Sequence, residues 1–182
     1  MLTDESLVRS AKQGEAAAYA ELVRRWSAPI LAVCRARVRC RHAAEDLAQD
    51  TLLRGWESIR SLQDDRKIGA WLRGIAQRVC LDWLKRHQNQ QVPFSVVGET
   101  IKGGDGFASE AESPEEQFMK RSEEARLQAE IDRLPEDERE TLLLYATGDW
   151  TYQQLAELLD VAVGTVNARL ARARERICRH LR

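Results

Sequence analysis

Hydrophobic residues recur at helical spacing along most of this chain, and no segment shows a convincing strand-like alternation. The clearest stripe, at steps of four, three and four, runs through Ile68, Leu72, Ile75 and Val79. Two shorter stripes comprise Leu22, Trp26 and Ile30, and Leu52, Trp56 and Ile59. The first of these is expected to be interrupted near Pro29, because proline lacks the helical N–H. The pattern predicts a bundle of about four helices that ends near residue 87.

The second half begins with signals that start and stop helices. Ser113, Pro114 and Glu116 combine an N-cap, a first-turn proline and a capping box. The pair Leu134-Pro135 predicts the end of this helix and the start of another, which Gly148 is expected to terminate.

Another helix start follows directly. Thr151 is predicted to be its N-cap, with Gln154 returning the capping bond and Trp150 packing on Leu155. The whole chain is therefore predicted to be all-α.

Residues 88–113 differ from both halves, because they mix Gln, Gly, Ser and acidic residues without helical periodicity. A stretch of this length without regular structure is too long for a compact connection. We expect two small helical domains, over residues 1–90 and 114–182, joined by a flexible acidic linker over residues 91–113.

The strongest motif lies in residues 151–176, TYQQLAELLDVAVGTVNARLARARER. A short helix to Leu159, a turn at Asp160-Val161-Ala162 and an arginine-rich second helix form the pattern of a helix-turn-helix. The face of the second helix predicted to be buried carries Val163, Val166, Leu170, Ala173 and Ile177. The opposite face is centred on Ala168, Arg172, Glu175 and Arg179.

That exposed face suits a DNA major groove. A small residue at its outermost point lets the helix approach closely, Arg and Asn can read base edges, and flanking arginines can hold phosphates. The candidate DNA-binding residues are Thr165, Asn167, Ala168, Arg169, Ala171, Arg172 and Arg176.

Charge is unevenly distributed, although the 182 residues carry 28 basic and 29 acidic side chains and a net charge of −1. Residues 1–90 have a net charge of +5 and residues 164–182 of +5, while residues 91–120 have −4 and residues 121–163 have −7. Two basic blocks separated by acidic stretches indicate two nucleic-acid contacts. The acidic middle also predicts weak binding of the isolated chain to free DNA, since non-specific affinity comes mainly from neutralised phosphates.

The segment GTVNARLARAR, residues 164–174, resembles the recognition helix of region 4 in extracytoplasmic-function sigma factors, which are bacterial transcription initiation factors. The preceding LPEDERETLLL and TYQQLAELLDV are also similar to that family. The resemblance implies that the helix-turn-helix reads the −35 promoter element.

The first half extends this resemblance. DESLVRSAKQGEAAAYAELVRRW, residues 4–26, is similar to the opening helix of the family, and AEDLAQDTLLR, residues 44–54, to the helix that docks on RNA polymerase. The implied polymerase contacts are Asp46, Gln49, Asp50, Leu53 and Arg54. Their polar groups and one apolar anchor suit a specific protein interface.

The family's reader of the −10 element corresponds to residues 61–86. A loop that captures a flipped base and a helix that holds single-stranded DNA need a basic track and a pocket or aromatic platform. The base-selecting loop residue is expected within Gln63, Asp64, Asp65 and Arg66. The helix candidates are Trp71, Arg73, Arg78, Lys85 and Arg86; both Trp71 and Trp83 could stack on bases or pack between helices.

These features predict a bacterial alternative sigma factor that binds core RNA polymerase and directs promoter-specific initiation. The alternative is a stand-alone helix-turn-helix regulator whose N-terminal bundle senses a ligand or dimerises. The resemblance implies as partners the β′ coiled coil and the β flap of the polymerase, promoter DNA and an anti-sigma protein. It also implies that the linker runs toward the active-site channel of the polymerase.

Enzymatic activity is not expected, because the sequence has no catalytic triad, metal-ligand set or phosphate-binding loop. GGDG, residues 103–106, lacks the Lys-Ser/Thr that completes such a loop. The four scattered cysteines are interpreted as small hydrophobic residues on helices in a reducing cytoplasm, not as disulfides or ligands, so no cofactor or metal is expected. No segment predicts a membrane span, although an anti-sigma partner could tether the chain to a membrane.

Overall fold

The computed structural model describes residues 2–88, 114–148 and 150–181, and the linker predicted over residues 91–113 lies outside them, as does the cap predicted at Ser113. The described residues form helices without strands, as the periodicity predicted. None of the described helices is long and apolar enough to cross a membrane.

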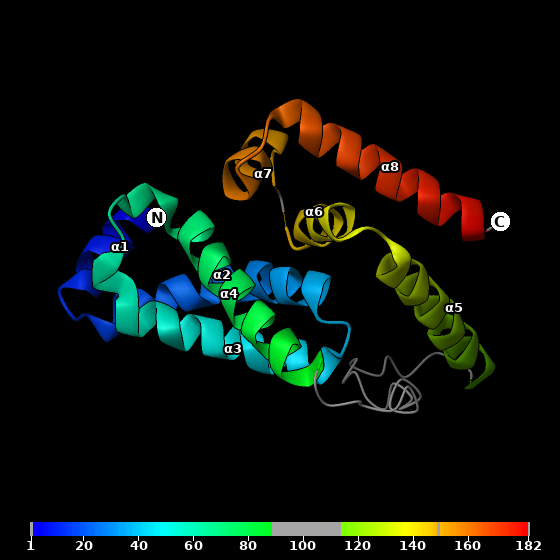
Figure 1. Cartoon of the computed structure of the whole chain (residues 1–182), viewed down its shortest axis with the longest axis horizontal. Helices are drawn as coiled ribbons and strands as arrows, with labels where there is room; N and C mark the ends of the chain where they lie inside the picture. Colours follow the sequence, from blue (N-terminus) through cyan, green and yellow to red (C-terminus); the bar gives the residue numbers. More distant parts are fainter. Residues whose placement is uncertain (1, 89–113, 149, 182) are drawn as a thin grey trace.

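Four helices make up the first half, in agreement with the prediction (Figure 1). They are α1 (Asp4–Lys12), α2 (Ala16–Arg37), α3 (Arg41–Ser58) and α4 (Ile68–Gln88), with short 3-10 turns η1 (Ile59–Ser61) and η2 (Asp65–Lys67) between α3 and α4. The predicted stripe of α4 is buried, including Ile68 and Leu72 at 1% exposure.

The expected interruption near Pro29 is wrong, because α2 continues through this proline. Pro29 is buried, and α2 packs along α3, α4 and α6. These tertiary contacts support the helix on both sides of the position where proline removes one backbone hydrogen bond.

The second half contains α5 (Pro114–Arg133), α6 (Glu136–Ala146), α7 (Tyr152–Leu159) and α8 (Val163–Leu181). Leu134-Pro135 separates α5 from α6 as predicted, but α6 ends at the C-cap Thr147, and Gly148 does not adopt a positive φ. The predicted capping box of α7 is confirmed, with Thr151 and Gln154 bonded reciprocally.

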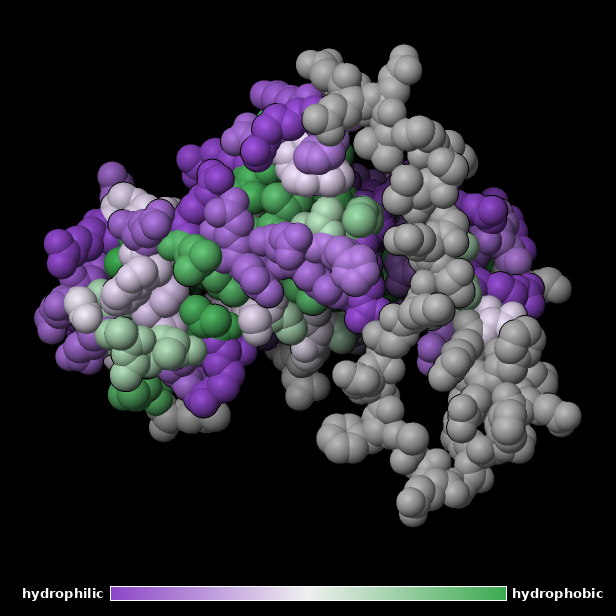
Figure 2. Space-filling view, turned by 90° about the horizontal axis from the view of Figure 1, so that it is seen from below, coloured by the Kyte–Doolittle hydropathy of each residue, from purple (hydrophilic) through white to green (hydrophobic). Residues whose placement is uncertain are grey.

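The two halves share one hydrophobic core. α6 lies between α2 of the first half and α8 of the second, and α7 contacts α4 (Figure 1). Trp150, predicted to pack on Leu155, also packs against Trp26 of α2, with ring centroids 5.9 Å apart. Leu144 and Leu155 are fully buried within the same cluster as Leu22 and Ile30. On the face seen in Figure 2, hydrophobic residues form only small patches among hydrophilic ones.

The four cysteines are free, as expected. Cys34 and Cys80 are buried, whereas Cys40 and Cys178 are exposed. A hydrogen bond with Cys80 and burial both raise the pKa of the Cys34 thiol, which keeps it protonated and inert. Within the described residues, no group of His, Cys, Asp and Glu side chains could hold a metal ion.

Candidate nucleic-acid interface

The helix-turn-helix forms where the sequence predicted it. Asp160 ends α7 in the left-handed conformation, with φ of 56°, and Val161 N–H donates to the Ala156 carbonyl oxygen at 3.0 Å. An aspartate tolerates this backbone better than a β-branched residue would. The turn therefore redirects the chain within three residues and fixes the angle at which α8 leaves α7.

The exposed and buried faces of α8 largely agree with the wheel. Val166, Leu170 and Ala173 are buried, but Val163, which was assigned to the buried face, is 39% exposed. Val163 is the first residue of α8 and borders the open depression beside the turn, so its side chain stays partly accessible. The predicted DNA-facing residues Asn167, Ala168 and Ala171 are exposed, and Thr165 is half-buried.

Acidic residues at the start of α6 hold one flank of α8. Asp137 Oδ2 lies 2.7 Å from Nη2 of Arg169, whose side chain is only 15% exposed. Glu138, whose side chain is 7% exposed, places its two oxygens 3.2 Å from Arg172 Nε and 3.1 Å from Arg176 Nε. Both of these guanidiniums are engaged through Nε, which leaves their Nη groups free to meet a phosphate or a base edge.

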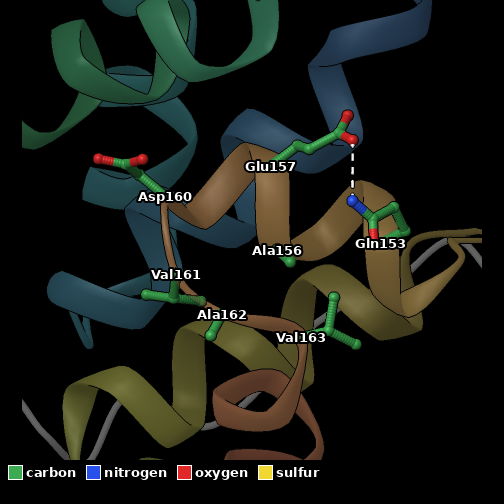
Figure 3. Close-up of a pocket in the computed structure, with 7 residues that line it drawn as sticks. All are labelled: Gln153, Ala156, Glu157, Asp160, Val161, Ala162 and Val163. Atoms are coloured by element: carbon green, nitrogen blue, oxygen red, sulfur yellow. Dashed lines mark hydrogen bonds between the residues drawn. The ribbon is translucent and has the colours of Figure 1, made fainter.

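A shallow open depression lies beside the helix-turn-helix (Figure 3). Its lining combines the apolar Val161, Ala162 and Val163 of the turn with Glu157 and Asp160. The Gln153 side-chain amide donates to Glu157 at 3.2 Å. Two carboxylates at this surface repel phosphate, which disfavours the depression as a DNA-contacting surface.

The residues predicted to select a −10 base lie in the connection between α3 and α4. Arg66 pairs with Asp64 through two hydrogen bonds of 3.0 and 3.1 Å, and Gln63 is exposed. The hydrogen bond from Arg66 lowers the pKa of the Asp64 carboxyl. Asp65 instead contacts Lys12 Nζ at 2.5 Å, which ties this connection to α1.

The predicted residues of α4 do not share one environment. Arg78, Lys85 and Arg86 are exposed, whereas Trp71 is half-buried and packs against the core. Arg73 is directed toward the second half, where it contacts Glu140.

Trp83, the other aromatic candidate, is half-buried and stacks on His87 with centroids 4.0 Å apart. His87 therefore covers one face of the indole, which leaves less aromatic surface for stacking on a base than the sequence predicted.

The predicted polymerase-binding residues come together on one face of α3. Asp46, Gln49 and Leu53 are exposed at successive turns, and Leu53 has 65% of its surface accessible. Asp50 bonds Arg54 on the same face, at 3.0 Å. An exposed leucine surrounded by polar groups is a suitable anchor for a protein partner.

Sequence reasoning missed the polar contacts between the two halves. Glu140 of α6 is 2% exposed and pairs with Arg73 and Arg37, and Arg139 donates to the Ala36 carbonyl oxygen. Burial alone raises the pKa of Glu140, but the hydrogen bond from Arg73 and the positive charges of Arg37 and Arg73 outweigh it, so the pKa lies below its ordinary value. Charged residues normally predict a solvated face, so no local signal marked these positions.

Two regions of the chain match known family models. Residues 22–90 match sigma-70 region 2, and residues 124–177 match sigma-70 region 4. The first range covers most of α2 and all of α3 and α4, and the second covers part of α5, all of α6 and α7, and most of α8.

Similar proteins carry the same description. An extracytoplasmic-function (ECF) RNA polymerase sigma-E factor of Salmonella typhimurium is 30% identical over 182 residues, which is 97% of this chain and 93% of that protein. A longer relative from Xanthomonas campestris is 33% identical over 157 residues, and the chain spans 38% of its length. The solved structure of CnrH in complex with the cytosolic domain of CnrY has a TM-score of 0.65 at 23% identity, covering 98% of this chain and 96% of that one, and shows the same fold.

Proposed function

The chain belongs to the extracytoplasmic-function group of the sigma-70 family, and we propose that α8 and α4 recognise the promoter while α3 binds the polymerase. As a sigma factor it binds core RNA polymerase and directs initiation at particular promoters, through binding rather than catalysis. The proposed boundaries are residues 1–90 for polymerase binding and −10 recognition, and 114–182 for −35 recognition, with a linker over 91–113.

The observation that carries the proposal is the geometry of α8. Its exposed face combines small residues with Asn167 and Arg172, while Glu138 holds the inner side of Arg172. A helix of this kind fits a major groove, and the free guanidinium edge can reach guanine. We assign −35 contacts to Thr165, Asn167, Ala168, Ala171, Arg172 and Arg176, with Arg169 serving mainly to anchor α8 on α6.

In the first half, DNA and polymerase contacts are assigned to side chains that are exposed. Arg78, Lys85 and Arg86 supply a basic track on α4, and the connection containing Gln63 and Arg66 is accessible for a flipped base. The exposed face of α3 around Leu53 is the proposed contact with the β′ coiled coil, and the β flap is the proposed contact of the second half.

An anti-sigma protein is a further proposed partner. CnrH, which has a similar fold, was solved in complex with the cytosolic domain of CnrY. We propose that the chain acts in the cytoplasm and that such a partner could hold it near a membrane.

The test is capture of bacterial core RNA polymerase by the full chain, followed by transcription from a promoter library. Stable capture with promoter-selective transcripts supports the proposal. Failure to capture the polymerase, together with tight binding of the chain alone to a palindromic duplex, would instead favour a stand-alone regulator. The full chain alone is expected to bind duplex promoter DNA weakly, because its net charge is −1.

A further inference from the structure

A buried cluster of charges joins the two halves of the chain. The Glu140 carboxylate of α6 accepts hydrogen bonds from Arg73 of α4, at 2.7 Å from Nε and 3.1 Å from Nη2, and from Arg37 of α2, at 3.2 Å from Nη2. Exposure of these side chains is 2% for Glu140, 11% for Arg37 and 18% for Arg73. One carboxylate from the second half is thus enclosed by two guanidiniums from the first.

Within the described residues, Arg37 and Arg73 form no ion pair with an acidic side chain of the first half. In the amide orientation that satisfies its neighbours, the Gln77 side-chain oxygen accepts from Arg37 at 2.9 Å and from Arg73 at 3.2 and 3.0 Å. Among the described ion pairs, the acidic partners of Arg37 and Arg73 are Glu136 and Glu140, both on α6. Without α6, the first half would present two converging guanidiniums with no counter-charge.

We propose that Arg37 and Arg73 form a phosphate-binding site for single-stranded DNA, and that Glu140 occupies this site when the two halves are packed together. A guanidinium binds a carboxylate and a phosphate through the same fork of N–H donors, so either anion can satisfy the pair. The inference rests on the proposed function and deepens it, because it adds Arg37 to the residues that hold the melted strand.

The position of the site fits a strand that follows α4. Arg73 lies on the same helix as the exposed Arg78, Lys85 and Arg86. While Glu140 fills the site, it neutralises charge on this helix, and α6 packs against α2 beside Arg37. The packed chain is therefore a poor ligand for single strands, and separation of α6 from α2 and α4 completes the track.

The experiment measures binding of the full chain to a fluorescent single-stranded DNA of mixed sequence, together with its radius of gyration in solution. Glu140→Gln keeps the shape of the side chain and removes its charge. Glu123→Gln is the matched control, because it removes an exposed carboxylate on α5, away from the proposed DNA-binding faces. We expect a larger radius and about tenfold tighter binding for Glu140→Gln, and little change for Glu123→Gln.

The salt dependence identifies the donors. Two added phosphate contacts steepen the slope of log affinity against log salt by about 1.4 for a single strand. Adding Arg37→Ala or Arg73→Ala to Glu140→Gln should remove most of the gain in affinity while the radius stays large. If circular dichroism shows that Glu140→Gln does not fold, Glu140→Asp is the milder substitution, since it retains the negative charge but shortens the side chain.

Two outcomes would overturn the inference. In the first, Glu140→Gln expands the chain but binds single strands no better than Glu123→Gln does. In the second, it changes neither the radius nor the affinity. Capture of core polymerase by the wild-type chain is measured separately, so failure here leaves the sigma-factor proposal standing.

Discussion

The guanidinium of Arg139 in α6 donates to the carbonyl oxygen of Ala36 in the last turn of α2, at 2.7 Å from Nε, with Nη2 of the same side chain also bonded to this oxygen. The last carbonyl groups of a helix have no partner within the helix, so a residue 103 positions away completes α2. Nη1 of the same arginine donates to the carbonyls of Asp132 and Leu134, at 2.8 and 3.1 Å. One buried side chain therefore links the end of α2 to the α5–α6 connection.

Replacing Arg139 by alanine is expected to destabilise the packed chain by about 2–4 kcal/mol, because three carbonyl groups, two of them buried, lose a charged donor. Urea unfolding measures the change. Arg133→Ala is the control, since the Arg133 side chain, which pairs with Glu130, is 68% exposed. Loss of this pair should cost less than about 1 kcal/mol. Equal effects of the two substitutions would contradict the role given to Arg139.

The aromatic contact between the halves depends on a glycine. A Cβ atom at Gly69 would overlap the indole of Trp26, which packs on Trp150 and donates to Asp4 Oδ2 at 2.9 Å. We expect Gly69→Ala to lower the free energy of unfolding by about 1–3 kcal/mol, because the indole must leave both contacts. Gly164→Ala meets open space at the start of α8 and should be neutral or slightly stabilising in the same denaturation assay.

Glu138 is predicted to hold the arginines that read the −35 element. Glu138→Gln should reduce the preference of the holoenzyme for promoters with an intact −35 element severalfold, because Arg172 and Arg176 lose a shared charged partner. Transcription from matched promoters with and without that element gives the ratio. Glu123→Gln, which removes an exposed carboxylate of α5 instead, should leave the ratio unchanged. A uniform loss at both promoters would indicate a purely structural role.

Acid should loosen the contact between the halves. The pKa of Glu140 in the folded chain lies below its ordinary value of 4.5, so its stabilising contribution is complete above that pH and is lost as the pH falls through the lower, folded pKa. The difference in unfolding free energy between wild type and Glu140→Gln should be constant from about pH 6 to 8 and shrink below about pH 4.5. A difference that stays constant down to pH 3 would show that this carboxylate is not the titrating group.

The two interfaces should give different mutant phenotypes. Arg172→Ala is expected to cost roughly 1–3 kcal/mol at promoters with an intact −35 element, if it makes a bidentate contact with a base. Asp46→Ala combined with Gln49→Ala should weaken polymerase binding equally at every promoter. Holoenzyme assembly and promoter titrations separate these effects, and identical promoter-independent defects would refute the division of roles.

Much of the local structure follows from neighbouring residues. The helix-turn-helix could be read directly, since the capping box of Thr151 and Gln154 and the stripe through Val166 and Leu170 act within one or two helical turns. The exposed face of α3 was equally accessible to prediction. Local rules failed at Pro29, where contacts from other helices support a continuous α2, and they gave no sign that Trp150 packs on Trp26.

The sequence alone was sufficient to establish the all-α class, the helix-turn-helix and the family resemblance, because caps, periodicity and motifs are properties of short segments. The tertiary structure decided which charges are buried and with which partner. Glu140 and Arg73 are 67 residues apart, and each has the composition of a surface position. Their pairing exists only because α6 packs against α2 and α4, where removal of water turns two ordinary charges into a specific contact.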